Sequence, residues 1–343
     1  MSQSSLALVG DIGGTNARFA LADLSSPGVE LLESKSLPNA DFASIQHAIE
    51  HYLAGVDARP ARAALAVACP VGDDEIRLTN RAWSFSRSEL QRTLGLDELR
   101  MLNDFGAVAW AVPALEREHL VTLHGPSTGS GQAAAPLRGP VSVLGPGTGL
   151  GVALLVGSHE HGWHVVETEG GHVGFSPVGD EERAISAWLT AKHGRTSTER
   201  LVCGKGISEI DAVLRGAGVL PSKLGTLPGD GSLHETGLRD PADIVTAALE
   251  GHDVASRRTL ARFCSVLGSV AGDCALIHGA RTVVIAGGIV PRFIPFLRSS
   301  QFRERFLAKG RMAALLESVP IHVITHPNPG LLGAATALRA KEF

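Results

Sequence analysis

Two adjacent polar residues, Asn103 and Asp104, follow the apolar stretch Leu99–Leu102, which is typical of a short buried strand. In open α/β sheets, ligands bind beyond the carboxyl ends of parallel strands, so the carboxylate of Asp104 is a candidate general base. Phosphoryl transfer to an alcohol uses such a group, because a carboxylate orients and deprotonates the attacking hydroxyl. The alternative is structural: Asn103 or Asp104 only caps the helix that follows.

A second polar group comes from the segment Glu169-Gly-Gly-His172 and from Glu199. The glycines free the backbone, so that the side chains of Glu169 and His172 can point into one space. A metal site is the alternative for Glu169 and His172, but two ligands with no cysteine nearby are too few for zinc. For Glu199 the alternative is a carboxylate that only stabilises a helix start.

A first glycine-rich turn lies in Leu6–Asp23, LALVGDIGGTNARFALAD, between two apolar strands. Its tip consists of Gly13, Gly14, Thr15 and Asn16. Adjacent glycines let the backbone approach a ligand, and successive N–H groups form a cradle for an anion. Asp11, at the mouth of the turn, would repel a phosphate and is therefore a candidate to hold Mg²⁺, directly or through water. An ordinary hairpin, whose polar residues only satisfy the turn, is the alternative.

The stretch Val141–Val156, VSVLGPGTGLGVALLV, repeats the pattern of strand, glycine-rich turn and strand. The turn contains Gly145, Gly147, Thr148, Gly149 and Gly151. It is not a Walker A loop, which needs Gly-Lys-Ser/Thr at a helix start, and it lacks the third glycine of the dinucleotide fingerprint. Two such hairpins imply two related halves.

A third glycine pair, Gly287–Gly288, follows the apolar run Thr282–Ala286, which predicts a buried strand. Because glycine has no side chain, the backbone at this point could run alongside an adenine ring. Plain packing between a strand and a helix is the alternative.

The elements that must position these residues alternate between strands and helices. Ala63–Cys69 is an apolar run typical of a strand covered on both faces, whereas Asp253–His278 carries apolar residues at helical spacing. We therefore predict an α/β protein of two domains. The small domain is expected to span residues 1–112 plus about 326–343, and the large domain residues 113–325.

Composition limits the classes of function. With 343 residues, 44% of them hydrophobic, the chain can bury two cores, and its net charge of −4 offers no field for nucleic acid or an anionic membrane. Only Met1–Ser5 precede the first strand, and no apolar run approaches the ~18 residues of a membrane span. Four scattered cysteines without a Cys-x-x-Cys pair argue against disulfides and structural zinc. We expect a cytoplasmic protein.

The paired strand-turn-strand loops resemble those of the superfamily of sugar kinases, actin and chaperone ATPases. More specifically, nine motifs spread over essentially the whole chain resemble those of the bacterial glucokinase family. They are GDIGGTNARFAL, VACP, LTNRAW, LNDFGAVAWAVP, GPGTGLGVALL, EGGHVGFSP, TSTERLVCG, IAGGIVPRF and NPGLLGAA. The resemblance implies the two-domain actin-like ATPase fold, which is ribonuclease H-like, with a cleft between a small and a large domain.

The resemblance also implies a reaction, the ATP-dependent phosphorylation of glucose at O6 to glucose 6-phosphate, the first step of glycolysis. Asp104 would be the base on O6. The other sugar hydroxyls would be held by Asn103, Glu169, His172 and Glu199. Mg²⁺ and the phosphates of ATP would be held by Asp11, Gly13, Gly14, Thr15, Asn16, Gly145, Gly147, Thr148 and Gly149, and Gly287 and Gly288 would face the adenosine.

Three other functions stay open at this point. A kinase for another hexose or aminosugar would use the same groups, a non-catalytic sugar sensor would bind sugar without turnover, and a filament or chaperone ATPase would hydrolyse ATP without sugar. Related kinases and repressors with a cysteine-rich zinc motif share the Glu-Gly-His element, but those cysteines are absent here. The expected partners are glucose and ATP, with no nucleic acid or membrane, and a homodimer is left open.

Overall fold

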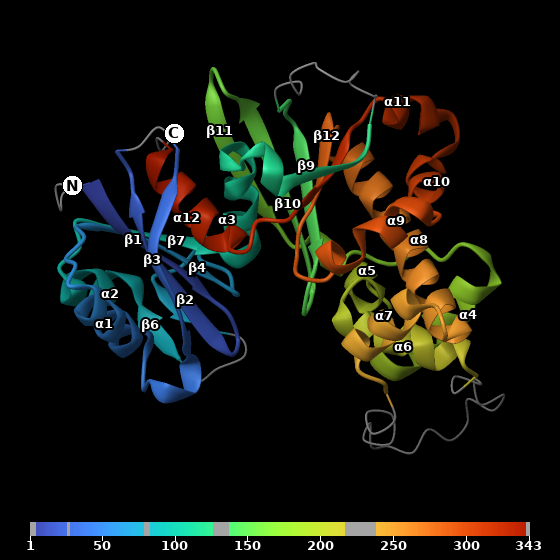
Figure 1. Cartoon of the computed structure of the whole chain (residues 1–343), viewed down its shortest axis with the longest axis horizontal. Helices are drawn as coiled ribbons and strands as arrows, with labels where there is room; N and C mark the ends of the chain where they lie inside the picture. Colours follow the sequence, from blue (N-terminus) through green and yellow to red (C-terminus); the bar gives the residue numbers. More distant parts are fainter. Residues whose placement is uncertain (1–4, 26–27, 79–82, 126–136, 217–237, 341–343) are drawn as a thin grey trace. The chain divides into compact units, whose positions relative to one another are not determined.

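The computed structural model describes residues 5–25, 28–78, 83–125, 137–216 and 238–340 (Figure 1). Thr79–Ala82 of the LTNRAW motif lie outside these residues. Contacts divide the chain into two compact units. Unit 1 comprises Met1–Leu120, Ala153–Glu167 and His326–Phe343, and unit 2 comprises Val121–Val152 and Thr168–Thr325. The predicted domain boundary after residue 112 stays a prediction.

The described chain contains both strands and helices. The strands are β1 (Leu6–Ile12), β2 (Asn16–Asp23), β3 (Glu30–Pro38), β4 (Arg62–Val67), β5 (Glu75–Arg77), β6 (Ser84–Ser86), β7 (Glu98–Asn103), β8 (Leu120–His124), β9 (Val141–Pro146), β10 (Leu150–Ser158), β11 (Gly162–Thr168), β12 (Thr282–Ile285) and β13 (Ile321–Ile324). The helices are α1 (Ile45–Val56), α2 (Arg87–Leu94), α3 (Asp104–Ala111), α4 (Gly179–His193), α5 (Thr198–Leu201), α6 (Gly204–Leu214), α7 (Pro241–Glu250), α8 (Val254–Ile277), α9 (Ile294–Ser299), α10 (Phe302–Leu307), α11 (Ala313–Glu317) and α12 (Pro329–Arg339).

One sheet of unit 1 has the order β3-β2-β1-β4-β7. β1 pairs antiparallel with β2, whereas β1, β4 and β7 run parallel to one another. The register pairs Ile12 with Val67 and Val67 with Asn103, so the three parallel strands end together. The turn that follows β1 and the residues Asn103–Asp104 therefore lie at the same edge of this sheet.

Helices cover the sheet of unit 1. α12, the last helix of the chain, packs against α3 and against β1 and β4, and Figure 1 shows α12 in red beside α3. Gly333 makes this close approach possible, because a Cβ atom there would overlap the carbonyl oxygen of Ala107. α1 and α2 complete the apolar core with buried side chains such as Ile49 and Leu90.

A six-stranded sheet has the order β11-β10-β9-β12-β13-β8. β12 runs parallel to both β9 and β13. Its first five strands, β11-β10-β9-β12-β13, have the same arrangement as β3-β2-β1-β4-β7 in unit 1. In both, three consecutive strands stand in reverse chain order and are followed by two strands from later in the chain. Two related halves, as inferred from the paired glycine-rich turns, are expected to share such an order.

α8 is the central helix of unit 2 and packs against α6, α7 and α10. Its 24 residues are long and apolar enough to cross a membrane by length and composition, which the sequence analysis did not anticipate. The apolar window is 67% buried inside the structure, with Phe263, Val266 and Leu267 fully buried. The position of α8 in the core of unit 2 therefore explains its apolar composition.

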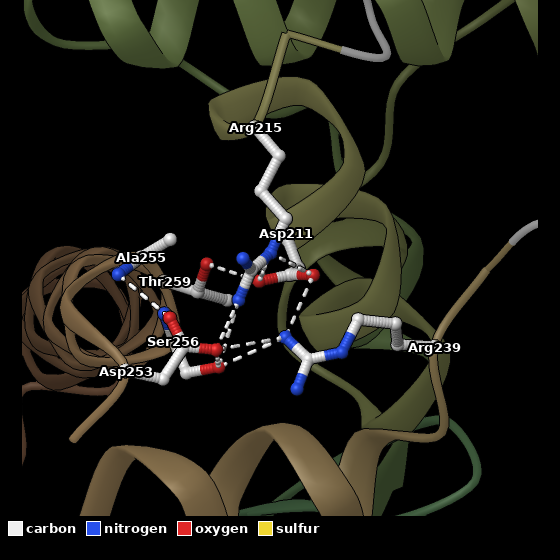
Figure 2. A network of polar contacts seen from close by, with 7 residues as sticks. All are labelled: Asp211, Arg215, Arg239, Asp253, Ala255, Ser256 and Thr259. Atoms are coloured by element: carbon white, nitrogen blue, oxygen red, sulfur yellow. Dashed lines mark hydrogen bonds and ion pairs between the residues drawn. The ribbon is translucent and has the colours of Figure 1, made fainter. Parts of the chain in front are cut away.

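A polar network joins α6, the start of α8 and the residues that lead into α7 (Figure 2). Asp211 is buried and accepts hydrogen bonds from Arg215 Nε at 2.9–3.0 Å, and Arg239 lies 3.5 Å from the same carboxylate. Asp253 caps α8, and its Oδ2 accepts a hydrogen bond from Arg239 Nη1 at 3.3 Å. The Ser256 hydroxyl and Arg215 lower the pKa of the Asp253 carboxyl. Arg239 precedes Asp240, the residue that caps α7, so the network holds the chain just before this helix.

Candidate active site

The first glycine-rich turn joins β1 to β2 and is held from both sides. The N–H of Gly13 donates to the Asn16 carbonyl at 3.0 Å, which closes the turn. The buried Asn39 also contacts the turn: its side-chain amide donates to the Gly13 carbonyl at 2.8 Å, and its backbone N–H donates to the Thr15 carbonyl at 2.9 Å. With these carbonyls engaged, the turn keeps a fixed shape.

Asp11 stands at the mouth of this turn with few partners for its charge. It pairs across the hairpin with Arg18, whose Nη1 lies 3.4 Å from Asp11 Oδ2. A Cβ atom at Gly330 would lie 3.0 Å from Asp11 Cγ, so the carboxylate faces the N-terminal turn of α12. Burial raises the pKa of the Asp11 carboxyl, although Arg18 acts in the opposite direction. A desolvated carboxylate with one distant cation fits a magnesium ligand, because Mg²⁺ in nucleotide sites is held by one or two carboxylates and by phosphates.

Asn103 and Asp104 begin helix α3. The Asn103 side chain caps the helix, because its Oδ1 accepts the N–H groups of Phe105 at 3.0 Å and Gly106 at 3.1 Å. Asp104 is the first residue of the helix, where the helix dipole favours a negative charge. Its Oδ1 accepts the N–H of Phe105 at 2.7 Å. Asn103 Oδ1 therefore caps the helix, which was the structural alternative for this residue. The Asp104 carboxylate lies at the carboxyl end of β7.

The second glycine-rich turn, Gly147–Gly149, is built by close backbone contacts within unit 2. The N–H of Gly147 donates to the Gly149 carbonyl at 2.8 Å, and the N–H of Gly204 at the start of α6 donates to the Gly147 carbonyl at 2.9 Å. Gly287 has a φ of +87°, and a Cβ atom there would overlap the carbonyl oxygen of Pro146. Gly287 is therefore placed against this turn in a conformation that favours glycine.

Glu169, His172 and Glu199 are brought together in unit 2. His172 Nε2 lies 3.7 Å from Glu169 Oε2, and His172 Nδ1 lies 3.8 Å from Glu199 Oε1. The side chains of Glu169 and His172 are 71% and 58% exposed, whereas that of Glu199 is 27% exposed. Two carboxylates on either side of one accessible imidazole give three polar groups that can bind neighbouring hydroxyls.

Glu199 has a second task, which explains its lower exposure. Its Oε2 accepts the N–H of Leu150 at 2.9 Å, at the end of the second turn. A Cβ atom at Gly149 would overlap this Oε2, so Gly149 leaves room for the carboxylate. The side chain therefore touches both the glycine-rich turn and His172.

The turn that carries Glu169 and His172 also depends on close packing. A Cβ atom at Gly171 would overlap the Leu150 carbonyl, and Thr198 Oγ1 donates to the Gly171 carbonyl at 2.6 Å. Arg195 donates to the carbonyl of His172. Gly170 and Gly171 thus let this turn lie against β10, next to helix α5, which carries Glu199.

An apolar pocket of about 330 Å³ lies in unit 2 beside the segment that follows Gly287–Gly288. Its lining comes from the start of α6, from one face of α7 and from Ile289 and Arg292. The lining residues from the helices are Gly204, Ile207, Pro241, Ala242, Val245, Thr246 and Leu249.

Two residues that support the first turn were not identified from the sequence. Arg18 could have been found by closing the hairpin at Gly13–Asn16, because that register places it opposite Asp11. Asn39 carries no local signal, since it lies 26 residues from Gly13 in the chain and meets the turn only through the fold.

The chain was compared with known proteins and known structures. The Glucokinase family model matches residues 8–341. The glucokinase of Chromohalobacter salexigens is 42% identical over 98% of both chains, and that of Citrobacter koseri is 40% identical over 97% of both chains. The crystal structure of glucokinase from an Antarctic psychrotroph is 35% identical, covers 97% of this chain and 98% of its own, and has a TM-score of 0.81.

The structural likeness confirms the expected fold, the two-domain α/β fold of the actin-like ATPases. The family match and the sequence identities extend over nearly the whole chain, including every segment that supplies a candidate site residue. The chain belongs to the glucokinase family.

Proposed function

We propose that this protein transfers the γ-phosphoryl group of ATP to O6 of glucose and releases glucose 6-phosphate and ADP. The observation that carries the proposal is the cluster of Glu169, His172 and Glu199, whose ionisable groups lie 3.7–3.8 Å apart in unit 2. Membership of the glucokinase family supports the same reaction.

The cluster is suited to a sugar because it offers charged acceptors and an imidazole within reach of one another. Hydrogen bonds to ionised groups contribute about 1.5–3 kcal/mol each, and a site built to bind a hydroxyl strongly rejects an analogue without it. In the proposal, Glu169, His172 and Glu199 bind hydroxyls on the anomeric side of the sugar, and Asn103 binds another through its amide.

Asp104 is proposed as the general base. Its carboxylate accepts the proton of the O6 hydroxyl while O6 forms a bond to the γ-phosphorus. The bond from the γ-phosphorus to the bridging oxygen breaks at the same time, and ADP leaves with that electron pair. The position of Asp104 in the first turn of α3 favours the ionised carboxylate before the reaction.

The two glycine-rich turns are proposed to hold the phosphates, through Gly13–Asn16 in unit 1 and Gly145–Gly149, with Thr148, in unit 2. Asp11 would hold Mg²⁺, directly or through water, and Mg²⁺ when bound neutralises charge on the phosphate oxygens. The low exposure of Asp11 and the raised pKa of its carboxyl support this assignment, since a nearby cation would favour its ionised form.

The apolar pocket beside Gly287–Gly288 is proposed to bind the adenine base. Its lining from α7 offers apolar side chains, and Arg292 adds a planar cation that can stack on a base. We further propose a cytoplasmic location. The four cysteines are buried thiols, which is typical of a reducing compartment.

A product assay over a panel of sugars tests the proposal. The purified protein is incubated with ATP, Mg²⁺ and glucose, mannose, fructose or N-acetylglucosamine, and phosphorus NMR identifies the phosphorylated position. Glucose should give the highest kcat/KM and a phosphate on O6. A higher kcat/KM for another sugar would reassign the substrate, and binding of glucose without any phosphorylated product would make the protein a sensor.

A further inference from the structure

Glu167, near the end of β11, contacts the residues that begin helix α3. Its Oε1 accepts the N–H of Asn103 at 3.0 Å. The same oxygen lies 2.5 Å from the position that a Cβ atom at Gly106 would take. Although the residue as a whole is exposed, burial of its carboxyl raises its pKa, against the opposing effects of the Asn103 N–H and Arg100. All these residues belong to unit 1.

This contact completes the cap of α3 from outside the helix. In a capping box, the third residue of the helix is a Glu or Gln that accepts the N–H of the N-cap residue. Here the N-cap residue is Asn103 and the third helical residue is Gly106, which has no side chain. The carboxylate of Glu167 accepts that N–H instead and fills the space that a side chain at Gly106 would occupy.

Two positions further along the chain, the same segment reaches the sugar cluster. Thr168 Oγ1 donates to the Val152 carbonyl at 2.7 Å and accepts the N–H of Gly170 at 3.2 Å, next to Glu169. Glu167 is the last residue of its segment of unit 1, and Thr168 is the first of its segment of unit 2. One short stretch of chain thus contacts the helix start that carries Asp104 and leads directly into Glu169.

We propose that Glu167 is a positioning residue for the base: it caps α3 in place of a side chain at Gly106 and so fixes Asn103 and Asp104 relative to the strand that leads to the sugar cluster. This inference rests on the proposed function of Asp104. Glu167 itself touches no reacting atom, and its effect on catalysis passes through the start of α3.

Replacing Glu167 should affect kcat more than the binding of glucose. Glu167→Ala removes the acceptor for the Asn103 N–H, and a misplacement of about 1 Å in a reacting group can cost up to ~100-fold in rate. We expect kcat to fall at least tenfold and the KM for glucose to rise by a smaller factor, because Asn103 is one of several groups that bind the sugar. Glu167→Gln keeps an acceptor oxygen of the same size, so it should stay within about twofold of wild type. Glu160→Ala, on the exposed turn before β11, is the matched control for the loss of charge.

Gly106 provides a second variant that tests the same contact. Gly106→Ala places a methyl group where the Glu167 carboxylate lies, so it should displace that carboxylate and lower kcat to the same extent. The kcat of the double variant, Gly106→Ala with Glu167→Ala, should then be no lower than that of either single variant, because both substitutions remove the same interaction. Independent losses that multiply would overturn the proposal, and so would a Glu167→Ala enzyme with wild-type kcat.

Amide hydrogen exchange separates this inference from the proposed function. The Asn103 N–H should exchange faster in Glu167→Ala than in wild type and Glu167→Gln, whether or not the protein phosphorylates glucose. Unchanged exchange would overturn the capping contact. Wild-type protein without glucose-dependent turnover but with the faster exchange in Glu167→Ala would contradict the proposed function and leave the capping contact in place, while removing its role in catalysis.

Discussion

The two glycine-rich turns have the same strand-turn-strand form and carry their charge in different ways. The first turn has its own carboxylate, Asp11, which is partly buried and faces the N-terminal turn of α12. The second turn has no carboxylate of its own and receives one from Glu199 on α5, which accepts the N–H of Leu150. Among the described residues, the Asp11 charge is paired with Arg18 at 3.4 Å and is suited to a cation, whereas the Glu199 charge is shared between the Leu150 N–H and His172.

This difference extends to the neighbouring residues in each unit. In unit 1, Asp104 stands like Asp11 near the N-terminal turn of a helix. In unit 2, Glu169 and Glu199 flank His172. In the proposed function, unit 1 therefore supplies the general base and the magnesium ligand, whereas unit 2 supplies the cluster that binds the anomeric side of the sugar.

The largest expected effect separates these two tasks at Asp104. Asp104→Ala should lower kcat by about 10²–10⁴-fold, because it removes a general base, while glucose binding measured by calorimetry stays close to wild type. Asp97→Ala, on an exposed position before β7, is the control. A fall in kcat of less than tenfold would mean that the base is another residue.

A change at Asp11 tests the charge of the first turn. Asp11→Asn should lower kcat/KM for MgATP by at least about tenfold, because it removes a charged ligand of the proposed metal site. Exposed Asp41→Asn is the control for activity.

Asp11→Asn should also be more stable than wild type at neutral pH. The pKa of Asp11 is raised in the folded state, so ionisation costs stability as pH rises from the unfolded pKa of about 3.9 through the folded value. Thermal unfolding should show this gain at pH 7 and little difference below about pH 4. A variant that is less stable than wild type at pH 7 would mean that the Asp11 charge is well compensated by the protein alone.

A matched pair of glycine substitutions tests the two turns against each other. Gly149→Ala should displace Glu199 and raise the KM for glucose at least about tenfold, because one charge-assisted hydrogen bond is worth about 1.5–3 kcal/mol. At Gly13 a Cβ atom meets nothing closer than the Asn16 carbonyl at 3.4 Å, so Gly13→Ala should leave the KM for glucose unchanged. Equal effects of both variants on glucose binding would remove the distinction between the turns.

Glu199→Gln is the finest test, because it keeps the shape and removes the charge. The amide oxygen can still accept the N–H of Leu150, so thermal stability should change little, whereas the KM for glucose should rise by about tenfold. Methyl glucoside, in which the anomeric hydroxyl is blocked, should be a poor substrate of the wild type by at least the same factor. Glu304→Gln on α10 is the control. Unchanged kinetics with a lowered melting temperature would show that Glu199 serves only the turn.

Local patterns predicted the elements well. The bounds of α2, for example, follow from local signals, because Ser86 caps its first turn and Gly95 ends it in the left-handed conformation. The apolar runs gave the parallel strands, and the parallel strands placed Asn103–Asp104 at the same edge as the first turn.

Contacts between distant residues were not predictable in the same way. Asn39 contacts Gly13 from 26 positions away in the chain, and Glu167 contacts Asn103 from 64 positions away. No periodicity or cap signal marks such contacts, because they depend on the registers of strands that pair only in the folded protein. The same holds for the shared role of Glu199, whose partners are Leu150 and His172.

ADP release by the wild-type protein, measured with and without glucose, tests the proposed reaction most directly. With ATP and Mg²⁺ present, release should be slow without sugar and should rise steeply on addition of glucose, in equal amounts with glucose 6-phosphate. ADP release that does not depend on glucose would identify an ATPase of another kind and would contradict the assignment of Asp104 as the base on O6.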